Sequence, residues 1–189
     1  MTLVAVTKTR PLEDLLAAYA GGVRHFGENR VQEAEAKFPQ LPRDAVKHLV
    51  GPIQSNKTNK VARLADVLHA VDSADVARRL ARAAGNEGRR LAVYVEVNTG
   101  GEETKAGVSP AAAPALVEAV RVLPELDLLG LMAIPPPGDT RPHFVALRSL
   151  AATLGLTGLS MGMSDDFEAA IEEGATVVRV GTALFGSRS

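Results

Sequence analysis

A lysine ends a short apolar run at the start of the chain, in the stretch LVAVTK that closes with Lys8. Such a run predicts a buried strand, so Lys8 would emerge at the point where that strand ends. A lysine in this position can act as a nucleophilic amine that forms a Schiff base with an aldehyde. The alternative is a strand-end lysine whose ammonium group extends into solvent, as lysines often do.

Small and hydroxyl residues gather in two segments near the C-terminus, SMGMSDD at 160–166 and RVGTALFG at 179–186. Gly162 allows a tight turn, Ser164 can cap the predicted helix DDFEAAIEEG that follows it, and the free N–H groups at the start of that helix can bind an anion. Gly181 and Thr182 would add a backbone amide and a hydroxyl from the following loop. The two segments therefore predict a phosphate site. The simpler alternative is that Ser164 only caps the helix that follows it.

A Schiff-base lysine and a phosphate site together suggest an aldehyde that carries phosphate. Pyridoxal 5′-phosphate (PLP) has both groups, and a sugar-phosphate aldolase, which the spacing leaves open, would also fit. Arg179 lies within the last apolar run, two residues before Gly181, and is expected to point toward the same ligand. On PLP it could donate to the pyridine nitrogen, which would make the ring a poor electron sink. A structural ion pair is the alternative for Arg179.

Eight strand-like runs must position these residues, and segments with helical spacing fill most of the intervals. The predicted strands are Leu3–Thr7, Arg24–Gly27, Lys47–Val50, Val67–Val71, Leu91–Asn98, Leu128–Ile134, Gly158–Ser160 and Thr176–Val180. Alternation of this kind implies parallel pairing, because each return to the next strand needs a crossover helix. The number of strands favours a (β/α)8 barrel of the TIM type over an open doubly wound sheet, although 189 residues is short for such a barrel.

We expect residues 1–189 to form a single α/β domain, with no full helix after the last strand. The formal net charge of −1 gives no general attraction to nucleic acid or anionic membranes, and the lack of cysteine excludes disulfides and thiolate metal sites. No apolar stretch approaches the roughly 20 residues of a membrane span, so we expect a cytoplasmic protein. The histidines show no paired metal-ligand spacing and are expected to be structural: His25, His48, His69 and His143.

The chain resembles the pyridoxal phosphate homeostasis protein family, also called the proline synthetase co-transcribed family. The matching segments follow the family's order along the whole chain: LVAVTKTRP, HFGENRVQEA, HLVGPIQSNK, GLMAIPP and LSMGMSDDFEAAIEEGATVVRVGTALFG. The resemblance implies a barrel similar to the N-terminal domain of alanine racemase, with PLP as its cofactor. It implies a Schiff base on Lys8, with Asn29 and the GPIQSNK loop nearby. The other implied ligands are Ser164, the Met163 amide, Gly181 and Thr182 for the phosphate and Arg179 for the ring nitrogen.

Members of this family have no established catalytic activity and are thought to buffer PLP or deliver it, which implies PLP-dependent apo-enzymes as partners. The alternative function is an amino-acid racemase, which needs an acid–base group on each face of its substrate. The two tyrosines of the chain, Tyr19 and Tyr94, fall within a predicted helix and a predicted strand, so a non-catalytic function is favoured. Relatives usually carry a further helix before the first strand, which is absent here. We expect a monomer or a weak homodimer.

Overall fold

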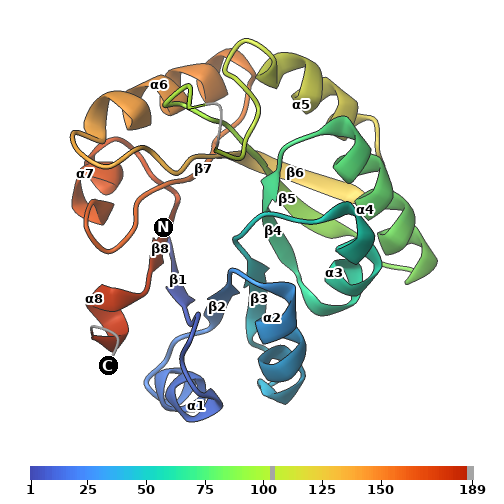
Figure 1. The fold of residues 1–189 in the computed structure, drawn as a ribbon, viewed down its shortest axis with the longest axis vertical. Helices are drawn as coiled ribbons and strands as arrows, with labels where there is room; N and C mark the ends of the chain where they lie inside the picture. The colour runs from blue at the N-terminus through green and yellow to red at the C-terminus, as the bar shows by residue number, and fades with distance from the viewer. Residues whose placement is uncertain (103–104, 187–189) are drawn as a thin grey trace.

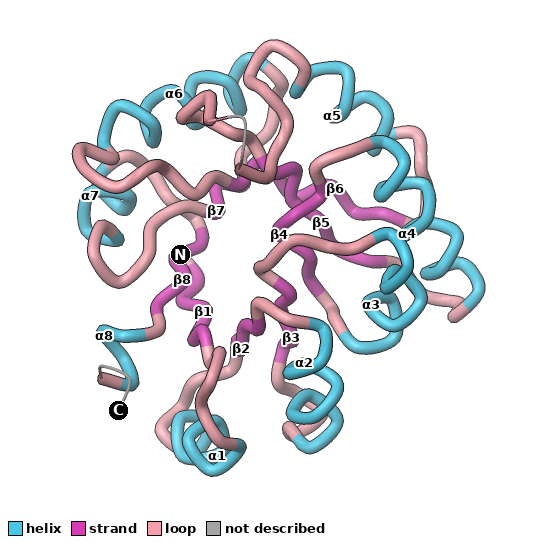
Figure 2. Tube along the Cα trace, viewed as in Figure 1, coloured by secondary structure: helices cyan, strands magenta, loops and turns pink. Residues whose placement is uncertain are grey.

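The computed structural model describes residues 1–102 and 105–186 (Figure 1). Eight strands form a closed barrel in which successive strands are neighbours and β1 pairs with both β2 and β8. Every pair is parallel. Figure 2 shows the ring of strands enclosed by an outer ring of helices. The predicted (β/α)8 barrel is therefore confirmed, and the open sheet is excluded.

Each predicted strand overlaps an observed one. The strands are β1 Thr2–Val6, β2 His25–Glu28, β3 Val46–Leu49, β4 Val67–Val71, β5 Leu91–Glu96, β6 Leu126–Met132, β7 Gly158–Ser160 and β8 Val177–Val180. The helices are α1 Leu12–Ala20, α2 Val31–Lys37, α3 Thr58–Leu64, α4 Ala74–Asn86, α5 Ala113–Arg121, α6 Arg141–Thr153, α7 Phe167–Glu172 and α8 Thr182–Phe185, with short 3-10 helices at Phe38–Gln40 and Ser55–Lys57. The start of β6 was predicted two residues too late, because Leu126 already pairs with Leu91 at the start of β5.

Two apolar clusters fill the molecule, one between the strands and the helices and one inside the barrel. The outer cluster includes Phe26 on β2, Leu68 on β4 and Leu80 on α4, all fully buried. The inner cluster is smaller and includes Val4 on β1 and Met132 on β6. Because side chains of a strand alternate between its two faces, strands covered on both faces must be apolar almost throughout, as the sequence shows.

The outer ring of helices is thinnest beside β8 and β1. Among the described residues, only the four-residue helix α8 follows β8, and it lies next to that strand in Figure 1. Leu3 on β1 is 41% exposed, although a fully covered barrel would bury it. The prediction that no full helix follows the last strand is thus confirmed for the described part of the chain. Within the same residues, no helix is both long and apolar enough to cross a membrane.

Candidate functional site

A cavity of about 320 Å³ lies at the carboxyl ends of the strands. Its lining includes all seven site residues predicted from the sequence, namely Lys8, Asn29, Met163, Ser164, Arg179, Gly181 and Thr182. Closure of the barrel brings the two ends of the chain together here, since Ala5 on β1 pairs with Val180 on β8. The predicted residues therefore converge on one site because they share the carboxyl end of the barrel, where ligands of this fold bind.

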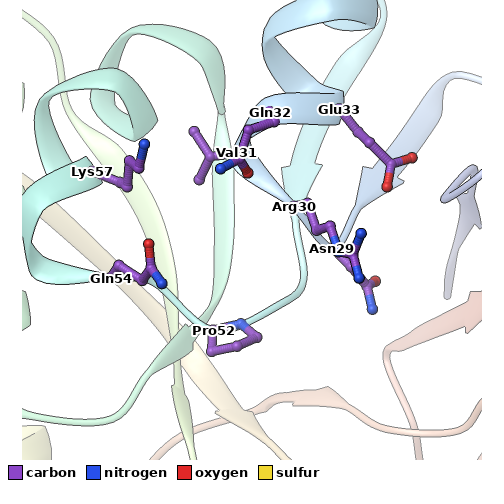
Figure 3. A pocket seen from close by; sticks show the side chains of 8 residues that line it. All are labelled: Asn29, Arg30, Val31, Gln32, Glu33, Pro52, Gln54 and Lys57. Carbon is purple, nitrogen blue, oxygen red and sulfur yellow. The ribbon is translucent and has the colours of Figure 1, made fainter.

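A larger hollow of about 610 Å³ lies beside the cavity and shares Asn29 and Pro52 with it. Figure 3 shows Gln54 and Lys57 on the side of this hollow opposite Asn29. Within the GPIQSNK loop, Gly51 and Pro52 line the cavity itself, whereas Gln54 and Lys57 line only the neighbouring hollow. The loop therefore contributes its first residues to the site and turns its later ones away from it.

Gly51 lets the loop after β3 lie directly against the loop after β2. A Cβ atom at Gly51 would lie 2.2 Å from the carbonyl oxygen of Asn29, a distance that no side chain tolerates. We expect Gly51→Ala to force the two loops apart and to lower the free energy of unfolding by about 1–3 kcal/mol, measured by urea unfolding. The control is Gly85→Ala on α4, where the new Cβ would meet only the Glu125 side chain at 3.5 Å. Equal stability of the two variants would contradict this expectation.

Lys8 lies in a turn whose backbone is held on both sides. Thr9 has a φ of 64°, in the left-handed region that residues with a side chain seldom adopt. Its N–H donates to Glu33 Oε2 at 2.8 Å, and the carbonyl of Thr7 accepts from Lys37 Nζ at 2.9 Å. Both neighbours of Lys8 are thus tied to α2, which fixes the direction in which the lysine leaves β1.

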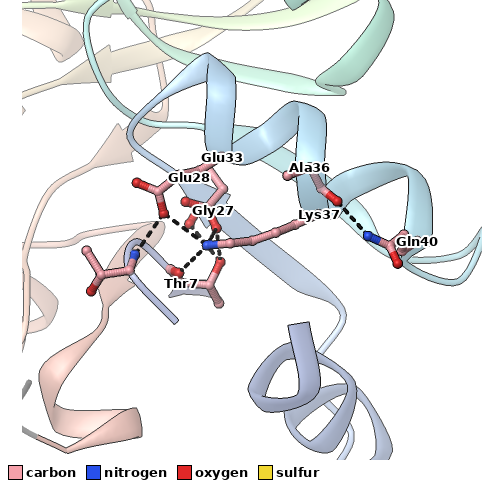
Figure 4. A network of polar contacts seen from close by, with 8 residues as sticks. Thr7, Gly27, Glu28, Glu33, Ala36, Lys37 and Gln40 are labelled. Atoms are coloured by element: carbon pink, nitrogen blue, oxygen red, sulfur yellow. Dashed lines mark hydrogen bonds and ion pairs between the residues drawn. The ribbon is translucent and has the colours of Figure 1, made fainter. Parts of the chain in front are cut away.

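Behind this turn lies a buried polar network, drawn in Figure 4. Glu28 is fully buried, and its Oε1 accepts from the Thr7 hydroxyl at 2.6 Å and from Lys37 Nζ at 2.8 Å. Lys37 also contacts Glu33 Oε2 at 3.0 Å. Burial raises the pKa of Glu28, while the hydrogen bonds from Lys37 and Thr7 oppose that rise. The sequence analysis did not identify this network, and only the Glu33–Lys37 spacing of one helical turn hints at it.

Ser164 does not cap α7, the helix that follows it in the chain, so that interpretation was wrong. Helix α7 begins at Phe167 with Asp166 as its N-cap residue. The Ser164 hydroxyl oxygen instead accepts the backbone N–H groups of Gly181 and Ala183, each at 3.2 Å. A contact with the residues that follow β8, including the first turn of α8, replaces the local cap because β7 and β8 are adjacent in the barrel. The two segments proposed to bind phosphate are therefore joined through Ser164.

The Met163 amide is already engaged within its own loop. Its N–H donates to Asp166 Oδ1 at 2.6 Å, so an anion must displace that carboxylate to reach it. Gly162 provides the predicted tight turn, since its φ is 91° and a Cβ there would lie 2.6 Å from the Ala170 side chain. The Met163 side chain lines the cavity whether or not its amide becomes available.

Arg179 is buried on β8 and is one of the residues that line the cavity. Nη1 donates to Ser160 Oγ at 2.6 Å and Nη2 donates to the carbonyl oxygen of Ala133 at 3.0 Å. Within the described part of the chain these hydrogen bonds go to a hydroxyl and a carbonyl and not to a carboxylate, which argues against a structural ion pair as its explanation. Burial lowers the pKa of Arg179 to about 10, an effect that Glu96 and Asp166 oppose, so it remains charged at neutral pH.

Glu96 at the end of β5 is a cavity residue that the sequence analysis did not identify. Its carboxyl is buried, and Oε2 has no hydrogen-bond partner among the described residues. Burial raises its pKa to about 7, with a further rise from Asp72 that Arg179 opposes. The only sequence signal was an acidic residue inside an otherwise apolar run. Near neutral pH the cavity therefore holds a carboxyl group that readily gains or loses a proton.

The raised pKa of Glu96 predicts a pH dependence of stability. The Glu96 carboxyl binds its proton more tightly in the folded than in the unfolded protein, so protonation of this group stabilises the fold. The stabilisation is complete below the ordinary pKa of a glutamate and is lost as the pH rises through about 7. Between these pH values the free energy of unfolding should fall by roughly 3 kcal/mol more in the wild type than in Glu96→Gln. Urea unfolding across this pH range measures the difference, and parallel curves would exclude it.

The mouth of this parallel barrel carries a lysine, two joined segments and a buried arginine. Known proteins have a barrel of the same kind. The chain matches the family model "Alanine racemase, N-terminal domain" over residues 1–189. It belongs to that family and, within it, to the pyridoxal phosphate homeostasis proteins. The Pseudomonas aeruginosa protein of that name is 49% identical over 195 residues, which cover 98% of this chain and 84% of the relative.

Solved structures agree with this assignment. The PipY protein of Synechococcus elongatus, solved without PLP, is 43% identical and superposes with a TM-score of 0.94 over 98% of this chain and 93% of PipY. The same protein with PLP bound gives a TM-score of 0.91. An alanine racemase of Clostridium difficile, at 16% identity and a TM-score of 0.82, matches the whole of this chain and 53% of its own and shows the shared fold. The resemblance identified from the sequence is confirmed.

Proposed function

We propose that this protein binds PLP at the barrel mouth, holds it as a Schiff base on Lys8, and buffers or delivers it without catalytic turnover. The observation that carries the proposal is that one cavity is lined by the amine-bearing Lys8, by the hydroxyl residues Ser164 and Thr182 on two joined segments, and by buried Arg179. The names of its relatives and the PLP-bound PipY structure support it. When bound, PLP supplies an aldehyde, a phosphate and a pyridine nitrogen, and the cavity has a fitting group for each.

The phosphate would lie at the joined loops. Because Ser164 Oγ already accepts two backbone N–H groups, its own hydroxyl proton is available to an anion. Hydrogen bonds that a hydroxyl oxygen accepts also polarise its O–H and strengthen it as a donor. Thr182 adds an exposed hydroxyl on the same side, at the start of α8. Arg179 would face the ring nitrogen from the opposite end of the ligand.

A racemase is the second candidate, and Glu96 is the observation that favours it. A carboxyl group with a pKa of about 7 in the cavity could take or give a proton opposite Lys8. No tyrosine is among the residues described as lining the cavity. The Tyr19 hydroxyl contacts Asp44, and Tyr94 stacks on His69 within the barrel. An arginine at the ring nitrogen also weakens the ring as an electron sink, which disfavours carbanion chemistry.

Two measurements test the proposal. Protein loaded with PLP and freed of excess cofactor should restore activity when it is mixed with the apo-form of a PLP-dependent enzyme, and cofactor-free protein should not. The loaded protein is then incubated with a panel of L-amino acids, and D-enantiomers and keto acids are measured against Lys8→Ala. We expect no product above that control. Clear D-enantiomer formation would replace the buffering function by that of a racemase.

A further inference from the structure

Three histidines inside the barrel form one continuous hydrogen-bonded chain. His25 Nδ1 lies 2.9 Å from His48 Nε2, and His48 Nδ1 lies 2.8 Å from His69 Nε2. His69 Nδ1 in turn lies 2.8 Å from Ser160 Oγ, which accepts from Arg179 Nη1 at 2.6 Å. We refer to His25, His48, His69 and Ser160 as the histidine chain. It runs from half-buried His25, at the start of β2, across β3, β4 and β7 to the arginine at the cavity.

Arg179 and the Ser160 hydroxyl together set the direction of the hydrogen bonds in the histidine chain, because a guanidinium can only donate and the hydroxyl proton then needs an acceptor. Ser160 Oγ accepts from it, and the described contacts offer the serine hydroxyl one acceptor, His69 Nδ1. His69 therefore carries its proton on Nε2 and donates to His48 Nδ1. By the same step His48 donates from Nε2 to His25 Nδ1. All three rings are thus neutral tautomers with the proton on Nε2.

The surroundings keep the rings neutral. Burial lowers the pKa of His48 to about 3, and the pKa of His69 also lies well below its ordinary value because this ring is fully buried. The nearby Arg179 cation lowers the pKa of His69 further. Tyr94 stacks on His69 with ring centroids 4.9 Å apart, which restricts rotation of the imidazole. With all three rings neutral and their tautomers fixed, a single pattern of hydrogen bonds gives every ring and the Ser160 hydroxyl a partner.

We propose that the histidine chain is a positioning device that holds the Arg179 guanidinium in the orientation needed to contact the ring of the bound ligand. This inference rests on the proposed function, since the pyridine nitrogen is the ligand atom that Arg179 would meet. An isolated serine hydroxyl could rotate freely, whereas one committed to His69 presents its lone pairs to Nη1. The Ala133 carbonyl fixes Nη2 in the same way, and the remaining N–H groups are left for the ligand.

The first test needs neither ligand nor variant. Nitrogen-15 NMR of histidine side chains in the cofactor-free protein should show His25, His48 and His69 as neutral Nε2–H tautomers at pH 7.5. His143 is the internal control, because its Nδ1 faces the carbonyl oxygen of Thr99 at 3.1 Å and must carry a proton. A proton on Nδ1 of His48 or His69 would overturn the proposal, whatever the protein binds.

The second test asks whether the histidine chain affects binding of the ligand. Ser160→Ala removes the group between His69 and Arg179, and PLP affinity should fall about tenfold, as expected for the loss of one hydrogen bond to a charged group. The matched probe is the PLP analogue in which C–H replaces the ring nitrogen, whose affinity should be the same for both proteins. An equal loss for both ligands would show a merely structural role and reject the proposal. If the wild type binds neither ligand, the proposed function is rejected instead. The NMR result would then still decide whether the histidine chain has the hydrogen-bond directions described above.

Discussion

A Lys8→Ala variant should fail to develop the visible absorption band that we expect when PLP is added to the wild type. The alanine side chain has no amine, so the aldehyde cannot be held covalently. The contacts to the phosphate and the ring are unchanged, and weak binding should persist. We expect the apparent affinity to fall by at least about a hundredfold, which corresponds to nearly 3 kcal/mol. Absorption titration and equilibrium dialysis measure the two effects.

The control for this prediction is Lys57→Ala. Lys57 lines the neighbouring hollow and not the cavity, so its loss should leave the band unchanged. Reduction of the loaded wild type with borohydride, followed by peptide mass analysis, should place the added mass on the peptide that contains Lys8. A band that survives in Lys8→Ala, or a label on Lys57, would refute the assignment of the cofactor lysine.

A Lys37→Met variant should be the most destabilised of the single variants considered. It removes the cation that pairs with fully buried Glu28, and it leaves the Thr7 carbonyl without that donor. Removing one partner of a buried ion pair costs about 3–5 kcal/mol, because the remaining charge stays buried and uncompensated. Urea unfolding at pH 7.5 measures this decrease in the free energy of unfolding. Because the network holds both neighbours of Lys8, PLP binding should weaken as well.

Lys60→Met is the matched control for this prediction. Lys60 pairs with Glu35 at 2.6 Å, but both side chains are substantially exposed. Such surface pairs contribute about 0–1 kcal/mol, so the variant should be nearly as stable as the wild type. Adding Glu28→Gln to Lys37→Met should recover part of the lost free energy of unfolding, because glutamine carries no charge that would remain buried and uncompensated. Equal losses for Lys37→Met and Lys60→Met would show that Glu28 does not depend on Lys37.

The sequence by itself determined the barrel and most of the cavity lining. Strand and helix periods alternate along the whole chain, and this local pattern is enough to require parallel pairing. Parallel strands place all their carboxyl ends at one mouth, so residues that follow strands, such as Lys8, Asn29 and Gly181, meet there without any knowledge of side-chain contacts. The resemblance then assigned roles to positions whose proximity followed from topology.

Only the tertiary structure decided which polar groups contact one another. Ser164 bonds the loop after β8 and does not cap α7, Glu28 pairs with Lys37, and His69 reaches Ser160 from three strands away around the barrel. These contacts depend on strand register and on closure of the sheet, which bring together side chains far apart in the chain. Local sequence patterns record which face a residue occupies. They do not record which residue of another strand lies opposite it, and that geometry decides the partners of every buried polar group.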